Sequence, residues 1–334
     1  MRRVNWTDAE IESWVPQVLA DAGLRSTGEI ERFSGGFGGC SFRAGRDYTV
    51  RFGARSGASC TRRSVEVMRA IQGRVRCPTV LYADFSCQSI PCNAIVYSYL
   101  RGEPLGNCWN DLKTEKRRHY ITQVVEQLSN LFATPWRGMV SFTEQQDWSQ
   151  YTWDRLASWF SEAYGQVDFP NACLDRMMEN ALNWRWSLEV VSDPVLIHGD
   201  VNWGNTIIDG EDVVGLIDFD NVEIGTADIE AWRLVGAIVS HGDTAIREAV
   251  SWIDDALPGV MYAPGAPERF GLEQVYEILW SLTQSEADGA GTREDALRDA
   301  MEDYRLLFCS DYYRDWFPQS VYGDWWPHGE SWGT

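Results

Sequence analysis

Residues 195–220 read VLIHGDVNWGNTIIDGEDVVGLIDFD, and the rest of the chain is organised around this stretch. It contains three short apolar runs that favour buried strands, Val195–Ile197, Thr206–Ile208 and Val213–Ile217. A polar loop follows the first run, and an acidic cluster follows the third. Because polar residues at the ends of buried strands lie at the mouth of a cleft, the stretch predicts a functional site.

The polar loop and the acidic cluster carry side chains that suit phosphoryl transfer. Asp200 can orient and deprotonate a hydroxyl group. Asn205 and Asp218 offer oxygen ligands to Mg²⁺, which prefers a few protein oxygens together with phosphate oxygens. We therefore predict Asp200 as the catalytic residue and Asn205 and Asp218 as metal ligands. We expect His198 to hold the loop, whereas two roles stay open for Asp220, metal binding and bracing of the loop.

The order His-x-Asp-x-x-x-x-Asn, followed by a strand and Asp-Phe-x, is the order of the catalytic core of kinase-like folds. Here Gly199 follows the histidine and Asp220 ends the acidic triplet. The resulting H-G-D-x-x-x-x-N and I-D-F-D motifs resemble the aminoglycoside phosphotransferase and choline kinase family of small-molecule kinases. The alternative to a catalytic core is a hairpin with exposed polar ends. It would require the five fixed positions of these two motifs to match the family by chance. The resemblance is strong at residues 195–220, fair at 29–52 and thin elsewhere.

The resemblance implies an α+β, bilobal protein-kinase-like fold, with a small antiparallel-sheet N-lobe and a mainly helical C-lobe. The pattern Arg101-Gly102-Glu103-Pro104 interrupts the strand run and predicts the boundary between the lobes. We therefore expect a nucleotide-binding N-lobe at residues 1–101 and a catalytic and substrate-binding C-lobe at residues 102–334. The strand before the boundary corresponds to the hinge of the family, so the backbone of Ser98 and Leu100 is expected to bind adenine.

The resemblance also assigns the phosphate contacts to the N-lobe. Backbone N–H groups of a glycine-rich loop can approach phosphate oxygens closely, and Ser41, just after the loop, can add a hydroxyl. The glycines of this loop are Gly35, Gly36, Gly38 and Gly39. Arg51 stands on the next strand, where the family commonly has a lysine that contacts the α and β phosphates. Arginine binds phosphate in a fork, so the role can survive with a different geometry.

Kinase-like folds hold the strand cation with a glutamate on the following helix, which we expect at residues 61–72. Glu66 is the only acidic residue there, but the family register places Ser64 at the glutamate position. A pair between Arg51 and Glu66 and a solvated Glu66 are therefore both open.

The composition and charge of the chain limit the kinds of partner that it can bind. The chain has 334 residues, a net charge of −20 and 44% hydrophobic residues, which indicates a globular protein and argues against nucleic acid or an anionic membrane as a partner. No apolar run approaches the ~20 residues of a membrane helix, and the N-terminus lacks the apolar core of a secretory signal. We expect a cytoplasmic protein whose 8 cysteines are reduced thiols, without a zinc site.

The function we expect is ATP- and Mg²⁺-dependent transfer of the γ-phosphoryl group to a hydroxyl of a small, cationic molecule. An aminoglycoside or a related antibiotic fits the family and the acidic balance, which implies a role in antibiotic resistance. The alternatives are a kinase of a metabolite, such as an amino alcohol, a sugar or a biosynthetic intermediate, and a nucleotide-binding pseudokinase scaffold. A carbohydrate-binding protein is a third reading, which rests only on the 17 tryptophans.

Overall fold

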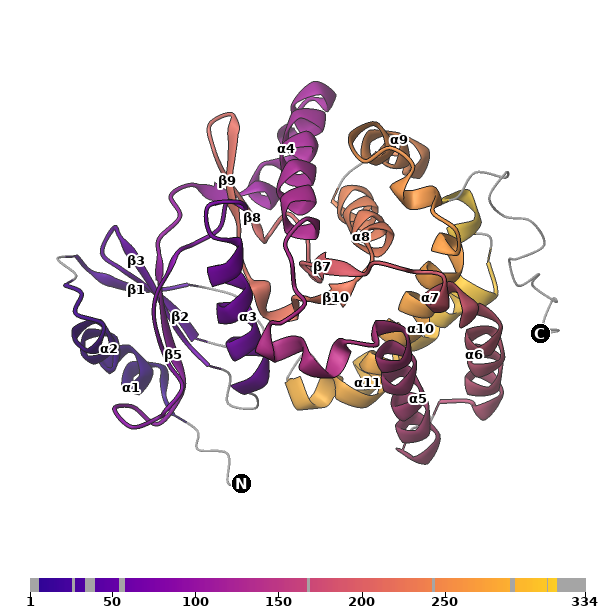
Figure 1. Ribbon diagram of the computed structural model, residues 1–334, viewed down its shortest axis with the longest axis horizontal. Coiled ribbons are helices and arrows are strands. Elements are labelled where there is room, and N and C mark those ends of the chain that lie inside the picture. Colours follow the sequence, from indigo (N-terminus) through magenta and orange to yellow (C-terminus); the bar gives the residue numbers. More distant parts are fainter. Residues whose placement is uncertain are drawn as a thin grey trace. The chain divides into compact units, whose positions relative to one another are not determined.

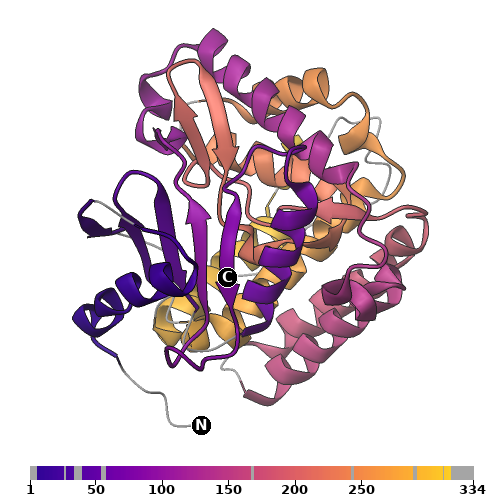
Figure 2. The ribbon, with the colours of Figure 1, turned by 60° about the vertical axis from the view of Figure 1, so that its left-hand side comes forward.

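The computed structural model describes residues 6–25, 28–33, 40–53, 58–166, 169–241, 244–288, 292–310 and 312–316. The chain divides into two compact units (Figures 1 and 2). The first comprises Met1–Ser141 and His198–Glu223, and the second comprises Phe142–Ile197 and Ile224–Thr334. The chain thus returns to the first unit at His198, so the catalytic loop belongs to the same unit as the N-terminal sheet. The lobe boundary expected after residue 101 stays a prediction.

The N-terminal sheet is antiparallel, with the strand order β1-β2-β3-β5-β4. Its strands are β1 (Ile30–Arg32), β2 (Cys40–Ala44), β3 (Tyr48–Phe52), β4 (Val80–Asp84) and β5 (Ala94–Ser98). In β3 the side chains alternate, with Val50 and Phe52 buried in a core while Arg51 stands on the opposite face.

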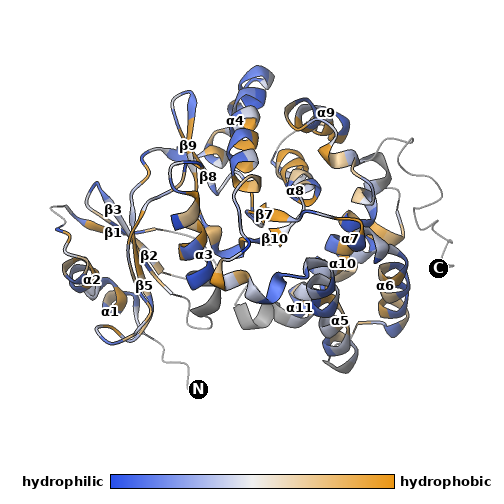
Figure 3. Ribbon diagram, in the orientation of Figure 1, coloured by the Kyte–Doolittle hydropathy of each residue, from blue (hydrophilic) through white to orange (hydrophobic). Residues whose placement is uncertain are grey.

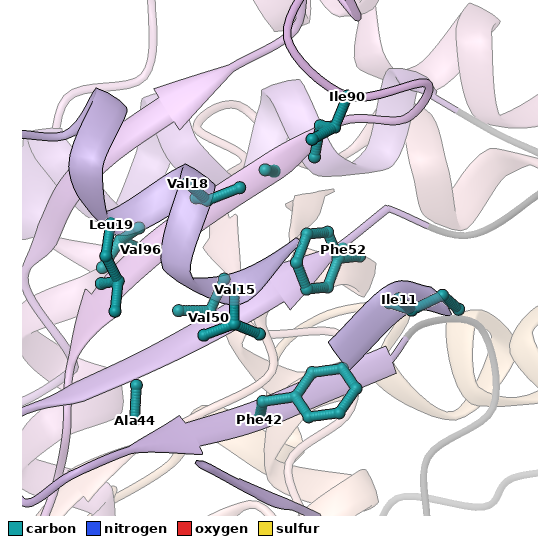
Figure 4. Close-up of a cluster of buried hydrophobic side chains, with 11 residues drawn as sticks. Ile11, Val15, Val18, Leu19, Phe42, Ala44, Val50, Phe52, Ile90 and Val96 are labelled. Carbon is teal, nitrogen blue, oxygen red and sulfur yellow. The ribbon is translucent and has the colours of Figure 1, made fainter. Parts of the chain in front are cut away.

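Two short helices, α1 (Asp8–Ser13) and α2 (Val15–Asp21), cover one face of this sheet. A capping box of Thr7 and Glu10 starts α1, and a proline stands in the first turn of α2, where no N–H partner is needed. Figure 4 shows how their apolar side chains meet those of the sheet. The cluster consists of Ile11, Val15, Val18, Leu19, Phe42, Ala44, Val50, Phe52, Ile90, Ala94 and Val96.

Helix α3 (Ala58–Ile71) lies on the other side of the sheet (Figure 1). The rest of the first unit contains helix α4 (Thr114–Phe132) and a three-stranded sheet in the order β6-β8-β9. Its strands are β6 (Glu103–Pro104), β8 (Thr206–Asp209) and β9 (Asp212–Leu216). Hydrophobic and hydrophilic residues alternate around α4 (Figure 3), and its apolar side packs against β9. Short 3₁₀ helices follow the boundary region and β9: η1 (Leu105–Asn107), η2 (Trp109–Asp111) and η4 (Phe219–Asn221).

The second unit is mainly helical, and its long helix α10 packs against α5, α6, α8 and α11. Its helices are α5 (Trp148–Gln166), α6 (Asn171–Trp184), α7 (Trp186–Glu189), α8 (Ala227–Ser240), α9 (Ile246–Ala256), α10 (Ala266–Asp288) and α11 (Arg293–Phe308). Strand β7 (Val195–Ile197) pairs with β10 (Glu223–Gly225). A buried ion pair, 3.0 Å between Arg269 Nε and Asp228 Oδ2, joins α10 to α8. Among the described helices, none is both long and apolar enough to cross a bilayer.

Candidate active site

The carboxylate of Asp200 is held by two asparagine amides of its own loop. Asn202 Nδ2 donates to Asp200 Oδ1 at 2.9 Å, and Asn205 Nδ2 donates to Asp200 Oδ2 at 3.0 Å. Asn202 Oδ1 in turn accepts the backbone N–H groups of Gly204 at 2.8 Å and Asn205 at 3.1 Å. Each carboxylate oxygen therefore has at least one fixed donor, and the loop holds Asp200 in place before a substrate binds.

The same bonds decide which atom of Asn205 is available for other partners. Its amide nitrogen is committed to Asp200, both to the carboxylate and to the backbone oxygen at 3.0 Å. Its Oδ1 has no hydrogen-bond partner within the described part of the chain. Asn205 thus presents an oxygen, which is the atom a hard cation prefers.

His198 is fully buried and uses both ring nitrogens to hold the backbone. Its Nε2 lies 3.0 Å from the carbonyl oxygen of Ile217, and its Nδ1 lies 3.3 Å from the backbone N–H of Asp200. Because the carbonyl only accepts and the N–H only donates, the proton of the neutral ring sits on Nε2. The ring therefore links the loop of Asp200 to the backbone just before Asp218, a scaffold role rather than that of a base.

Gly199 stands where protein kinases have an arginine, and the structure gives the reason. Its φ is +81°, and a Cβ at this position would lie 2.1 Å from the carbonyl oxygen of Asn221. No side chain fits between the loop and η4, so only glycine allows this close approach of the two backbones.

Asp218 adopts a left-handed backbone conformation, with φ 62° and ψ 64°. Residues other than glycine rarely do so, and such strain concentrates at functional sites. Hydrogen bonds on both sides of Ile217 fix this geometry, since its N–H donates to Asn205 O at 2.9 Å and its carbonyl accepts from His198. The backbone thus connects both predicted metal ligands, Asn205 and Asp218, through one residue.

Arg51 is the cation of the site and bridges two carboxylates. Its Nη1 lies 3.0 Å from Asp218 Oδ1, and its Nη2 lies 2.6 Å from Asp220 Oδ2. Burial opposes the charge of the guanidinium, but Asp220 and Asp218 outweigh it and raise the pKa of Arg51. Burial also raises the pKa of Asp220, although Arg51 works against that shift. The two shifts act in opposite senses: the raised pKa of Arg51 favours its charge, whereas the raised pKa of Asp220 disfavours its own, because burial and the neighbouring Asp218 outweigh the attraction of Arg51.

Glu66 is not the partner of Arg51. Its Oε1 accepts the backbone N–H of Val140 and its Oε2 accepts that of Ser141, both at 2.8 Å. Burial tends to raise the pKa of Glu66, but these hydrogen bonds outweigh it and lower the pKa. Both alternatives left open by the sequence are therefore wrong, since Glu66 neither pairs with Arg51 nor stands in solvent. It binds the backbone of residues 140–141, in the segment after α4.

The remaining predicted nucleotide contacts are only partly described. The glycines Gly35, Gly36, Gly38 and Gly39 lie outside the described residues. Ser41 stands directly opposite Arg51 in the β2–β3 register, so the two side chains share a face of the sheet. In the hinge segment, the N–H of Ser98 donates to Thr79 O at 2.9 Å. The N–H of Leu100 has no partner within the described part of the chain. These contacts to nucleotide stay predictions.

The oxygen donors near Asp218 suit a magnesium ion. Asp220 Oδ1 is buried and has no hydrogen-bond partner in the described structure, an arrangement that favours a nearby cation. Within that part of the chain, no group of three or more histidine, cysteine, aspartate or glutamate side chains is arranged to hold a metal. Mg²⁺ needs no such group when phosphate oxygens and water complete its shell. The donor set of Asn205 and Asp218, with Asp220 beside them, therefore fits Mg²⁺.

Sequence reasoning missed two contributions to this site. One is Asn202, which supplies the second amide to Asp200; its spacing from Gly204 is typical of an Asx turn and could have indicated it. The other is Asp220 as partner of Arg51, which depends on a contact across 169 positions of sequence.

Comparison with known proteins identifies the family. The sequence model of the Phosphotransferase enzyme family (APH) matches residues 29–258, so the chain belongs to this family. It is a small-molecule phosphotransferase that acts on an alcohol group. A search of curated protein sequences finds no significant match.

Solved structures of aminoglycoside phosphotransferases share the fold. The gentamicin complex of APH(2")-IIa has a TM-score of 0.66 at 16% identity, covering 92% of this chain and 99% of that chain. ADP-bound APH(2'')-Ib gives 0.62 at 17%, covering 90% and 97%, and APH(4)-Ia gives 0.63 at 15%, covering 90% and 99%. The predicted fold class is therefore confirmed.

Proposed function

We propose that this protein transfers the γ-phosphoryl group of ATP, with Mg²⁺, to a hydroxyl of a small cationic acceptor, an aminoglycoside or a related antibiotic. The observation that carries the proposal is the Asp200 carboxylate, fixed by one amide on each oxygen and tied through Asn205 and Ile217 to Asp218. Such a constellation suits a reaction in which the protein mainly positions groups and neutralises charge.

Each residue has a defined task in this reaction. Asp200 orients the acceptor hydroxyl and accepts its proton as the oxygen bonds to the γ-phosphorus, while the bond from that phosphorus to the leaving ADP breaks. Arg51 neutralises phosphate charge from the strand face that it shares with Ser41, while the glycine loop and the hinge carbonyl of Ser98 and N–H of Leu100 hold the nucleotide. Asn205 and Asp218 would hold Mg²⁺, which supplies charge neutralisation on the phosphate oxygens when bound.

Charge supports a cationic acceptor. The net charge of −20 repels anions and raises the local concentration of polycations, which aminoglycosides are. The similar solved structures include complexes of aminoglycoside phosphotransferases with gentamicin and with streptomycin and ATP. The same charge argues against nucleic acid and anionic membranes as partners.

Inactivation of an antibiotic would take place where ATP is available, and we propose the cytoplasm. Seven cysteines in the described part of the chain are free thiols, which supports a reducing compartment. In this setting the reaction would give resistance, whereas a metabolite acceptor would indicate a biosynthetic role.

The test is a screen for acceptor-dependent ATP consumption over aminoglycosides, other antibiotics, amino alcohols and sugars. With the acceptor found, Asp200→Ala should lower kcat by roughly 10²- to 10⁴-fold, the usual contribution of a general base. Asp209→Ala, an exposed aspartate at the end of β8, is the matched control and should keep wild-type turnover. Unchanged turnover in Asp200→Ala would end the proposal for Asp200, and nucleotide binding without any acceptor would favour the scaffold alternative.

A further inference from the structure

The carboxylates that hold Arg51 come from the residues after β9, not from helix α3. Both belong to the acidic triplet, with Asp218 and Asp220 each contacting one terminal nitrogen of the guanidinium. A forked guanidinium can bridge two separate carboxylates in this way. A lysine has a single ammonium nitrogen and cannot contact both carboxylates in the same arrangement. The arginine at position 51 and the second aspartate of the triplet therefore form one structural unit.

Helix α3 shows why no carboxylate reaches Arg51 from that side. Ser64 is buried, with 1% of its surface exposed, and its helix packs against η4, the element that carries Asp220. Ser64 is therefore a short, buried residue on the helix that contacts η4.

Glu66 cannot take the same direction. Two helical positions differ by about 200° around the axis, so Glu66 points away from the side that Ser64 faces. It is also committed to the backbone at residues 140–141. The carboxylate that contacts Arg51 comes instead from Asp220, at 2.6 Å.

We propose that Asp220 is the positioning residue for Arg51, in place of the helix glutamate of kinase-like folds, and that Ser64 is the small residue that makes room for it. This inference rests on the proposed function, because it assumes that Arg51 contacts nucleotide phosphates. Asp220 acts through Arg51 and fixes the direction of the guanidinium before nucleotide binds. Its contribution is therefore independent of metal.

The experiment measures ADP affinity by calorimetry, with EDTA and without Mg²⁺. Asp220→Asn should weaken metal-free ADP binding about 10- to 100-fold, which corresponds to the loss of a charge-assisted contact. The double variant Ser64→Glu with Asp220→Asn should recover most of the affinity, because it returns a carboxylate to the helix side. Ser64→Glu alone should not improve binding. Glu66→Gln is the matched control and should leave ADP affinity unchanged, because its side chain does not contact Arg51.

Two outcomes would overturn the proposal. One is wild-type metal-free affinity in Asp220→Asn, and the other is a loss that occurs only with Mg²⁺, which would make Asp220 a metal ligand. If Asp220→Asn does not fold, Arg51→Lys tests the same contact from the side of the arginine. It should also weaken metal-free ADP binding, and wild-type affinity in this variant would likewise overturn the proposal. Failure of the wild-type protein to bind ADP at all would instead refute the proposed function.

Discussion

Gly199→Ala offers a sensitive test of how the catalytic loop is positioned. The glycine has φ +81°, and the added Cβ would lie 2.1 Å from Asn221 O and 2.8 Å from Asn221 C. Both atoms belong to backbone, which cannot rotate away as a side chain can. The loop or η4 must therefore move, and Asp200 is the next residue in the chain.

The expected loss of folding stability in Gly199→Ala has two contributions. Placing alanine in the left-handed region costs about 1–2 kcal/mol. Relieving the overlap adds about 1–3 kcal/mol, as in other overpacked sites. Gly73→Ala is the matched control, since its φ is +79° and nothing lies within 4 Å of its added Cβ. It should show the backbone term alone, so the difference between the two variants isolates the contact with Asn221.

Urea denaturation and steady-state kinetics provide the readouts. Gly199→Ala should unfold at a lower urea concentration than Gly73→Ala, and its kcat should fall about 100-fold, as expected for a reacting group misplaced by about 1 Å. Gly73→Ala should keep the wild-type kcat. Equal stability of the two variants, together with a wild-type kcat in Gly199→Ala, would refute the reasoning about the loop.

Two further predictions concern the supports of the site. Glu66→Ala should lower the free energy of unfolding by about 1–2 kcal/mol at pH 7, because two backbone N–H groups lose a charged partner. The pKa of Glu66 is lowered in the folded state, so this difference should hold above the ordinary glutamate pKa of about 4.3 and shrink as the pH falls below it; a pH-independent difference in urea titrations would contradict it. His198→Phe keeps the ring shape but leaves two buried backbone groups unpaired, and should reduce stability by about 2–4 kcal/mol and kcat about 10- to 100-fold. Denaturation and kinetics check this, and a wild-type kcat would exclude the scaffold role.

Much of the fold could be predicted because its signals are local. The three apolar runs of residues 195–217 became β7, β8 and β9 with ends shifted by at most one residue. In β3, the alternating side chains of a strand account for the position of Arg51 on the face opposite the buried Val50 and Phe52. Periodicity and burial depend on neighbours in sequence, and so they are readable without a structure.

The contacts that define the site are long-range, and local patterns do not encode them. Arg51 and Asp220 are separated by 169 positions, and Glu66 meets Val140 at a separation of 74. The partner of Arg51 stayed undecided from the sequence, because the helix register places Ser64, which has no carboxylate, where the family has a glutamate. Gly199 was visible as a departure from the kinase motif, but its reason, the backbone of Asn221, required the structure.

The central claim is that Asp200 directs an acceptor hydroxyl to the γ-phosphoryl group of ATP. It is tested most directly by mass spectrometry of the acceptor after incubation with ATP, Mg²⁺ and either the wild-type protein or Asp200→Asn. We predict that the wild type forms a monophosphorylated acceptor and that the variant forms it roughly 10²- to 10⁴-fold more slowly, while the variant still binds ADP. The same yield of phosphate ester from both proteins would contradict the claim.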